Sequence, residues 1–142
     1  MSNHDSAQQG YPHAFRIRDF AAIGAGGVVG ALVRYAGELV LPSMTQGFPW
    51  ATFAENISGS FLLGFTAAFL ARRSPHPLLG PFLLVGVFGS YTTFSTFAVG
   101  FWTRIDVEQY ALAWAYAGST LVLGLIAVWL GHVCGRGRQA VP

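Results

Sequence analysis

The chain has 142 residues, of which 53% are hydrophobic and only 10% are charged. A soluble domain carries about 25% charged residues, so this composition excludes an ordinary soluble protein and predicts a small polytopic membrane protein. The formal net charge is +2, and the eight basic residues, all arginine, are too few and too scattered for a nucleic-acid-binding surface. Because Cys134 is the only cysteine, a disulfide framework and a cysteine-based metal site are excluded as well.

The chain begins with a polar segment, residues 1–18, which we expect to be a disordered tail. The first apolar run, residues 20–41, is long enough to cross about 30 Å of hydrocarbon. No small-residue cleavage pattern follows it, so we expect a retained transmembrane helix rather than a signal peptide.

Two features of this first helix point to structural roles. Gly26 and Gly30 are four residues apart on one face, where they let another backbone approach closely. Arg34 is costly to bury in a membrane and needs a partner. Glu38, one turn further on, is a candidate; alternatively, the Arg34 guanidinium extends to the lipid headgroups. We interpret Arg34 as a structural anchor.

The second predicted helix, residues 50–71, carries a polar stripe. Asn56, Ser60 and Gly64 recur every four residues and therefore share one face, and Thr52 extends that face by one turn. A polar stripe on a membrane helix faces protein or water rather than lipid. We interpret the stripe as the lining of an ion path; the alternative is that Asn56 only bridges two helices.

A glycine and a run of hydroxyl side chains interrupt the third apolar segment, residues 78–102, near its middle. Glycine weakens a helix, and serine and threonine side chains compete for its backbone hydrogen bonds. At bilayer depth, freed carbonyls are tolerated only where protein, water or an ion satisfies them. The sequence therefore predicts a third helix that is broken near its middle and a candidate ion site at the break.

Two phenylalanines follow the interruption on one face of the helix. Phe94 and Phe97 are three residues apart, which by itself would predict core packing or lipid contact. Beside the hydroxyl cluster, their positive ring edges are suited to stabilising a desolvated anion. Hydrogen-bond donors for such an anion are available nearby from Asn56, Ser95 and Thr96.

The fourth predicted helix covers residues 110–133, and a short tail of residues 134–142 follows it. Tyr116, Thr120 and Gly124 share one face at four-residue spacing. Tyr116 is interpreted either as part of an ion path or as an interfacial anchor, and the spacing does not decide between them.

Three stretches resemble, in order, the helix motifs of the Fluc (CrcB) fluoride channel family. They are Gly26-Gly27-Val28-Val29-Gly30-Ala31-Leu32-Val33-Arg34-Tyr35, Thr52-Phe53-Ala54-Glu55-Asn56-Ile57-Ser58-Gly59-Ser60-Phe61 and Gly89-Ser90-Tyr91-Thr92-Thr93-Phe94-Ser95-Thr96-Phe97. The resemblance implies an all-α membrane protein of four transmembrane helices that forms an antiparallel dimer with two pores. It also implies passive export of fluoride along a path formed by Asn56, Phe94, Phe97, Ser95, Thr96, Thr52, Tyr116 and Thr120.

The same resemblance implies a structural sodium ion, which is not transported, at the centre of the dimer. The backbone carbonyls that match its ligands are those of Gly89 and Thr92, and backbone oxygen suits a hard alkali cation. The sequence departs from the family at two positions: Gly100 stands where the family commonly has glutamate, and Glu55 stands where it usually has an apolar residue.

Two rival functions remain open from the sequence. A small proton-coupled multidrug antiporter needs a carboxylate within the membrane, and Glu55 is the candidate exchange site. A non-conducting subunit of a paired channel would use the polar stripes only for helix association. No Ser-His-Asp, metal-ligand or nucleotide motif indicates an enzyme.

The arginines predict the orientation of the chain in the plasma membrane. With four spans, both tails and the second loop share one side, where there are six arginines, and Arg104 is alone on the other side. Positive residues near span ends stay cytoplasmic, so we expect both termini in the cytoplasm. An antiparallel homodimer needs both orientations in similar amounts. The bias therefore favours pairing with a similar, oppositely oriented subunit, and otherwise with a second copy. The six arginines are Arg16, Arg18, Arg72, Arg73, Arg136 and Arg138.

Overall fold

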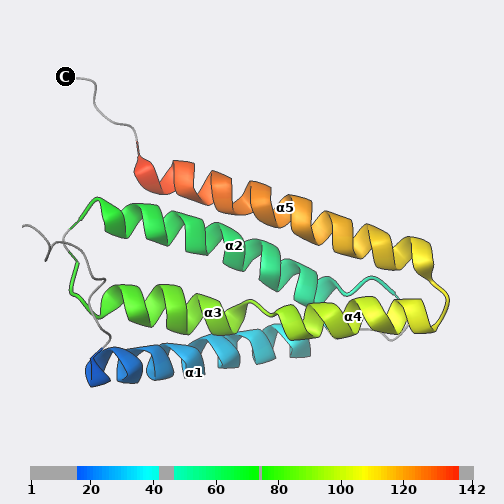
Figure 1. The fold of residues 1–142 in the computed structure, drawn as a ribbon, viewed down its shortest axis with the longest axis horizontal. Coiled ribbons are helices and arrows are strands. Elements are labelled where there is room, and N and C mark those ends of the chain that lie inside the picture. The colour runs from blue at the N-terminus through cyan, green and yellow to red at the C-terminus, as the bar shows by residue number, and fades with distance from the viewer. Residues whose placement is uncertain (1–15, 42–46, 74, 138–142) are drawn as a thin grey trace, which may run out of the picture.

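The computed structural model describes residues 16–41, 47–73 and 75–137, and these residues form an all-helical protein (Figure 1). Four stretches are long and apolar enough to cross a membrane, which confirms the number of spans predicted from the sequence. Most of the predicted N-terminal tail and of the C-terminal tail lies outside the described residues. The helices are α1 (Ile17–Val40), α2 (Trp50–Ala71), η1 (Pro81–Val87), α3 (Phe88–Tyr91), α4 (Phe94–Asp106) and α5 (Tyr110–Arg136).

Both outer helices are longer than the apolar pattern predicts. α1 begins at Ile17 rather than at residue 20, because the Asp19 carboxylate accepts a hydrogen bond from the Arg16 amide at 2.7 Å and so caps the first turn. α5 continues past residue 133 to Arg136. It ends at Gly137, whose φ of 62° is a backbone conformation that glycine adopts without strain.

The third span ends four residues later than predicted, at Asp106, because Arg104 belongs to the helix and not to the following loop. Its side chain is only 3% exposed. The Nε atom donates to the Gly47 carbonyl at 2.7 Å, and Nη1 donates to the Gly100 carbonyl at 2.8 Å. A charged residue can stay in the helix here because backbone oxygens of two segments solvate its guanidinium.

Small residues set the helix packing on both sides of the molecule. Gly26 and Gly30 of α1 lie directly against the Phe82 and Val87 carbonyls of η1, where any larger side chain would collide with backbone. Gly64 of α2 lies in the same way against a carbonyl of α5. These contacts join α1 to η1 and α2 to α5, and close backbone approach of this kind is how membrane helices associate.

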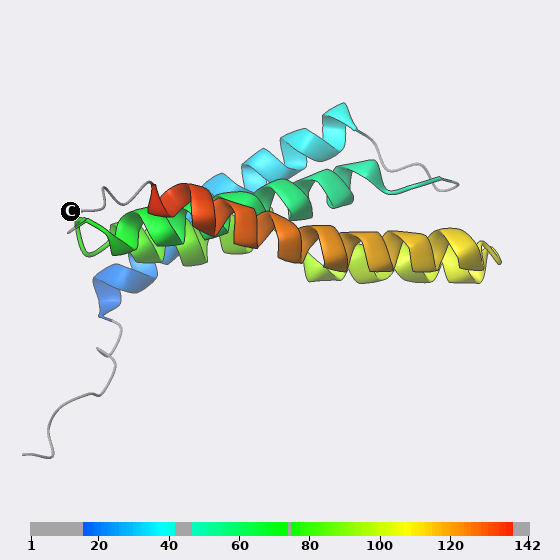
Figure 2. The same cartoon turned by 90° about the horizontal axis from the view of Figure 1, so that it is seen from above.

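The helices lie roughly side by side, in the order α5, α2, α3 with α4, and α1 (Figure 1). The C-terminal half of α1 diverges from the other helices, as the view from above shows (Figure 2). One end of the molecule holds the N-terminal end of α1, the C-terminal end of α5 and the connection from α2 to η1. The short turn between α4 and α5 lies at the other end.

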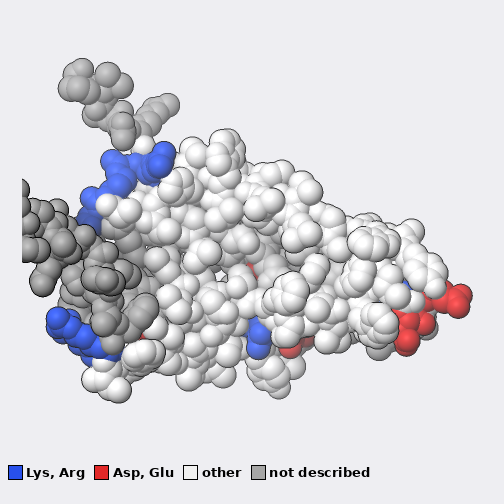
Figure 3. Space-filling view, viewed as in Figure 1, with Lys and Arg blue, Asp and Glu red and all other residues white. Residues whose placement is uncertain are grey.

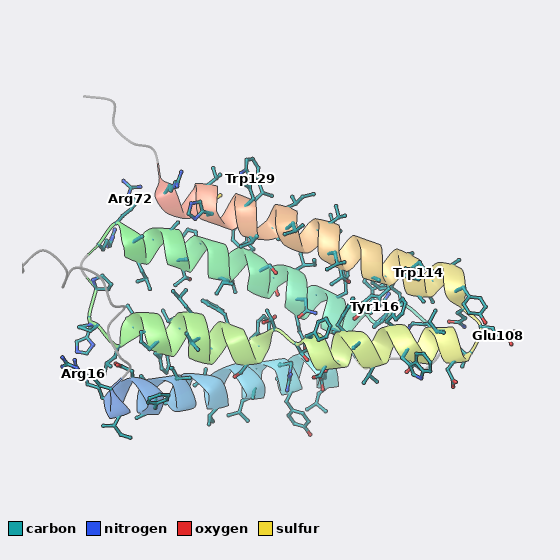
Figure 4. All side chains as sticks on the ribbon, in the orientation of Figure 1. Arg16, Arg72, Glu108, Trp114, Tyr116 and Trp129 are labelled. Carbon is teal, nitrogen blue, oxygen red and sulfur yellow. The ribbon has the colours of Figure 1, made fainter. Side chains whose placement is uncertain are left out.

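Charge is separated between these two ends (Figure 3). Most of the arginines in the described ranges lie at the end where α1 begins and α5 finishes. The acidic residues Asp106 and Glu108 lie at the other end, in the α4–α5 turn. Arg16 and Arg72 mark the first end and Glu108 marks the second (Figure 4). The surface between the two ends is largely uncharged, as expected for a surface in contact with lipid tails.

Candidate functional site

The backbone leaves the helical conformation for two residues between α3 and α4. Thr92 has φ −77° and ψ 150°, and Thr93 has φ −144° and ψ 124°, so both are extended. Within the span Pro81–Asp106, the Thr92 amide still donates to the Phe88 carbonyl at 3.0 Å, but the helical hydrogen bonds stop after it. The site is organised around the groups that replace those bonds.

Asn56 of α2 satisfies the backbone of Thr93 from the side. The Thr93 amide donates to Asn56 Oδ1 at 2.8 Å, and Asn56 Nδ2 donates to the Thr93 carbonyl at 3.1 Å. The side-chain amide therefore pairs with an extended residue as a neighbouring β-strand would. Asn56 bridges two helices, as the alternative interpretation of the sequence held, and it also lines the central cavity described below.

Thr93 caps the helix that follows. Its Oγ1 accepts a hydrogen bond from the Thr96 amide at 3.2 Å, donates to Thr96 Oγ1, and lies 3.1 Å from Ser95 Oγ. Threonine is a favoured N-cap residue because its side chain satisfies a free amide of the first turn. The sequence interpretation missed Thr93 as a site residue. The sequence signal that could have identified it is a threonine directly before the apolar run resumes, which is a favoured position for a helix N-cap.

The break leaves the carbonyls of residues 89–92 without their helical donors, and other groups have taken up two of those donors. In a continuous helix the Thr93 amide would bond the Gly89 carbonyl, and the Thr96 amide would bond the Thr92 carbonyl. Instead, Thr93 donates to Asn56, and Thr96 donates to the Thr93 hydroxyl. Gly89 is exposed, and a Cβ atom there would meet nothing within 4 Å. The two carbonyls predicted to bind a cation, those of Gly89 and Thr92, are therefore among the carbonyls that the break leaves without helical donors.

A cavity of about 430 Å³ lies beside the interruption, between α2, α4 and α5. Of the residues predicted to form an ion path, Asn56, Phe94, Phe97 and Thr120 line it. Phe94 is 80% exposed and forms an open edge. The remaining lining residues come from α2, the interruption and α5, and they are Ser60, Leu63, Thr92, Thr93, Leu121, Gly124, Leu125 and Val128.

The two phenylalanines continue into a row of rings that ends at Tyr116. The ring centroids of Phe94 and Phe97 are 5.9 Å apart, and those of Phe97 and Tyr116 are 5.2 Å apart. Tyr116 is completely buried and points between α5 and α4, and its hydroxyl has no hydrogen-bond partner among the described residues (Figure 4). If position 100 carried a Cβ atom, that atom would lie 3.6 Å from the Tyr116 hydroxyl, so Gly100 leaves space there.

Four predicted path residues lie outside the lining of this cavity. Thr52 is buried at 1% exposure, and Tyr116 lies behind Phe97. The hydroxyls of Ser95 and Thr96 belong to the capping network of Thr93. The spacing thus placed Thr52 on the correct face of α2 but could not show that neighbouring helices cover it.

The ionisable residues of α1 and α2 lie outside the cavity as well. Arg34 Nε is 4.0 Å from Glu38 Oε1, so the partner expected one turn away is the one found. Glu55 is 3% exposed and lies against Gly37 of α1. Neither of its carboxyl oxygens has a hydrogen-bond partner within the described part of the chain. Among the described residues, no arginine and no carboxylate lines the cavity itself.

Comparison with known proteins places the whole transmembrane region in one group. Residues 21–132 match the family model described as CrcB-like protein, Camphor Resistance (CrcB). A protein of Paracoccus denitrificans (strain Pd 1222) named Fluoride-specific ion channel FluC is 39% identical over 121 residues, which are 85% of this chain and 97% of the relative. A protein of Listeria monocytogenes serotype 4b (strain F2365) named Fluoride-specific ion channel FluC 1 is 41% identical over 118 residues, 82% of this chain and 97% of the relative.

Proposed function

Because the chain belongs to the CrcB family, we propose that it is a fluoride-specific ion channel through which fluoride leaves the cell passively. The observation in the molecule that supports this function is the cavity beside the interruption. It brings an amide, aromatic rings and hydroxyl-bearing residues together between membrane-spanning helices, and none of the described residues that line it carries a charge.

The chemistry of the cavity suits a small, strongly hydrated anion. Such an ion crosses a membrane only where protein groups replace its hydration shell. Asn56 Nδ2 carries two protons and uses one on the Thr93 carbonyl, so the second is available to the cavity. The positive ring edges of Phe94 and Phe97 add attraction that is weaker than that of an arginine. An anion can therefore be stabilised without being trapped.

Fluoride efflux from liposomes that contain the purified protein tests this function. We expect efflux with no comparable release of chloride and no dependence on a proton gradient. Liposomes prepared without protein serve as the control. Efflux that stops when the proton gradient is collapsed would instead support the antiporter, with Glu55 as its exchange site. Efflux that appears only with a second, similar subunit would still support a fluoride channel, and it would show that this chain conducts as one member of a pair rather than as a homodimer.

We further propose that the break in the third helix holds a structural sodium ion. The carbonyls of Gly89 and Thr92 would be its ligands, because both have lost their helical donors and a carbonyl without a partner at bilayer depth costs several kcal/mol. The Thr92 hydroxyl is less suited, since it donates to the Phe88 carbonyl at 2.8 Å.

Replacing sodium with N-methylglucamine, a large organic cation, is expected to lower both fluoride flux and the stability of the assembly, because the two carbonyls lose their partner. Flux and thermal stability are measured in both salts. Thr92→Val is a matched control: it keeps the backbone carbonyl and removes only the hydroxyl, so its sodium dependence should remain. Equal flux and stability in the two salts would mean that water or side chains satisfy the break.

The open sides of the site support a dimer. Phe94 is largely exposed, Gly89 faces open space, and the cavity lacks a wall beside Phe94. An antiparallel partner would cover these groups and bring a second pair of carbonyls to the same sodium ion. The separation of charge supports a partner of opposite orientation and reversed charge bias, because most of the described arginines lie at one end of this chain.

Labelling of a cysteine in the N-terminal tail tests the orientation. In a Cys134→Ser background, Ser6→Cys should react with a membrane-impermeant thiol reagent only after the cells are permeabilised, because the arginine-rich end is retained in the cytoplasm. The fraction labelled in intact cells is the measured quantity. If about half of the protein is labelled in intact cells, the chain inserts in both orientations and pairs with itself.

A further inference from the structure

A second cavity, of about 380 Å³, lies at the arginine-rich end of the molecule, between the last turns of α2 and α5. It is separate from the cavity at the interruption, and no residue lines both. Its floor is fixed by helix packing, because Gly135 of α5 lies directly against the Phe65 carbonyl of α2. Its rim carries Arg72 and Arg73, and both arginines are exposed.

The two arginines are positioned at this rim. The Arg73 guanidinium lies 4.3 Å from the centre of the Phe69 ring, and a cation–π contact of this kind holds it over the cavity wall. Arg72 extends from the end of α2 toward the end of α5 (Figure 4), where its Nη1 atom borders Gly137. Neither arginine forms an ion pair with another residue of the described ranges.

An apolar track leads from this rim toward the middle of the membrane span. Phe69, Phe65 and Phe61 follow one another along α2 as a stack of rings. Neighbouring centroids are 5.9 Å and 6.4 Å apart, with interplanar angles of 15° and 14°. Phe65 keeps 36% of its surface exposed. The cavity therefore has a basic mouth and an apolar wall that continues along the helix.

We propose that this cavity is a binding site for an anionic phospholipid. The phosphate group binds between Arg72 and Arg73, and an acyl chain follows the phenylalanine stack. The negative ends of two helix dipoles lie at this mouth and would repel a phosphate, so the arginines are required to reverse the local potential. Basic pockets between membrane helices at the cytoplasmic side are suited to anionic headgroups. The site is independent of fluoride conduction.

Native mass spectrometry of the full-length protein in detergent tests the site. The protein is mixed with phosphatidylglycerol or with phosphatidylcholine of the same acyl chains, and retained lipid is counted. We expect preferential retention of phosphatidylglycerol by the wild-type chain. The variant Arg72→Gln/Arg73→Gln should bind it roughly thirty-fold more weakly, because each basic residue near an anionic lipid contributes about a fivefold factor. Arg16→Gln/Arg18→Gln removes the same charge from the same end of the molecule and should bind normally.

Four results would overturn the proposal. The first is equal retention of the two lipids, and the second is an equal loss of binding in the two double variants. The third is dissociation of an oligomer by Arg72→Gln/Arg73→Gln without a change in lipid retention, which would assign this face to a second copy of the chain. Inorganic phosphate at millimolar concentration should not displace the lipid, because phosphate cannot replace the contact with the phenylalanine stack. Complete displacement would make this a free-phosphate site.

Discussion

Replacing Phe94 or Phe97 with isoleucine is expected to lower fluoride flux by on the order of a hundredfold while the protein remains folded. Isoleucine keeps an apolar side chain at the cavity but removes the positive ring edge. An anion that loses one of its few stabilising groups in a desolvated path pays roughly 2–3 kcal/mol, and each 1.4 kcal/mol corresponds to a factor of ten. Phe94 is largely exposed in the single chain, so its replacement costs little packing there.

The measurement is fluoride efflux from liposomes, with size-exclusion profile and helical content as checks on folding. Phe101→Ile is the matched control: Phe101 lies on the same helix, contacts Trp114 at a centroid distance of 5.2 Å, and does not line the cavity. Its flux should stay close to that of the wild type. Wild-type flux in both Phe94→Ile and Phe97→Ile would remove the rings from the conduction path.

Replacing Asn56 with leucine is expected to destabilise the protein and to abolish flux. Leucine is branched at Cγ like asparagine but forms no hydrogen bond, so the amide and carbonyl of Thr93 both lose their partners. Thr93 is buried, and two such groups cost about 2–6 kcal/mol together. The helical bond to Gly89 could then re-form and draw that carbonyl away from a cation.

Thermal stability in detergent and fluoride efflux are the two measurements for Asn56→Leu. Ser60→Ala is the matched control, because Ser60 lines the same cavity one turn further along α2 but forms no hydrogen bond to Thr93 in the described structure. It should change stability by less than Asn56→Leu does. Equal stability of the two variants would show that the extended segment is held by contacts other than the Asn56 amide.

The number and approximate position of the spans could be predicted because membrane crossing depends on length and hydropathy, which are local properties. The span ends could not be predicted from hydropathy alone. Arg104 looked like a loop residue, and only the fold shows that the Gly47 carbonyl, 57 positions earlier, accepts its hydrogen bond. A polar residue at a span end can belong to the helix whenever a distant segment satisfies it.

The candidate site shows the same limit at Asn56. The four-residue stripe placed Asn56 and Ser60 on one face of α2, and both line the cavity. The stripe could not indicate that the Asn56 amide pairs with the backbone of Thr93, 37 residues later, because that contact depends on how two helices pack. The same packing covers Thr52 and removes it from the lining, although its spacing is equally regular.

The uneven distribution of arginines and carboxylates gives each subunit an electric dipole along its length, with the positive pole at the end where α2 and α5 finish. In an antiparallel pair of identical chains the two dipoles cancel, and the current–voltage relation is symmetric. In the proposed pair, whose second member has the reversed bias, both positive poles would face the cytoplasm and the dipoles would add. Such a channel would rectify: it would draw fluoride more readily from the cytoplasmic side, and added salt would weaken that preference by screening.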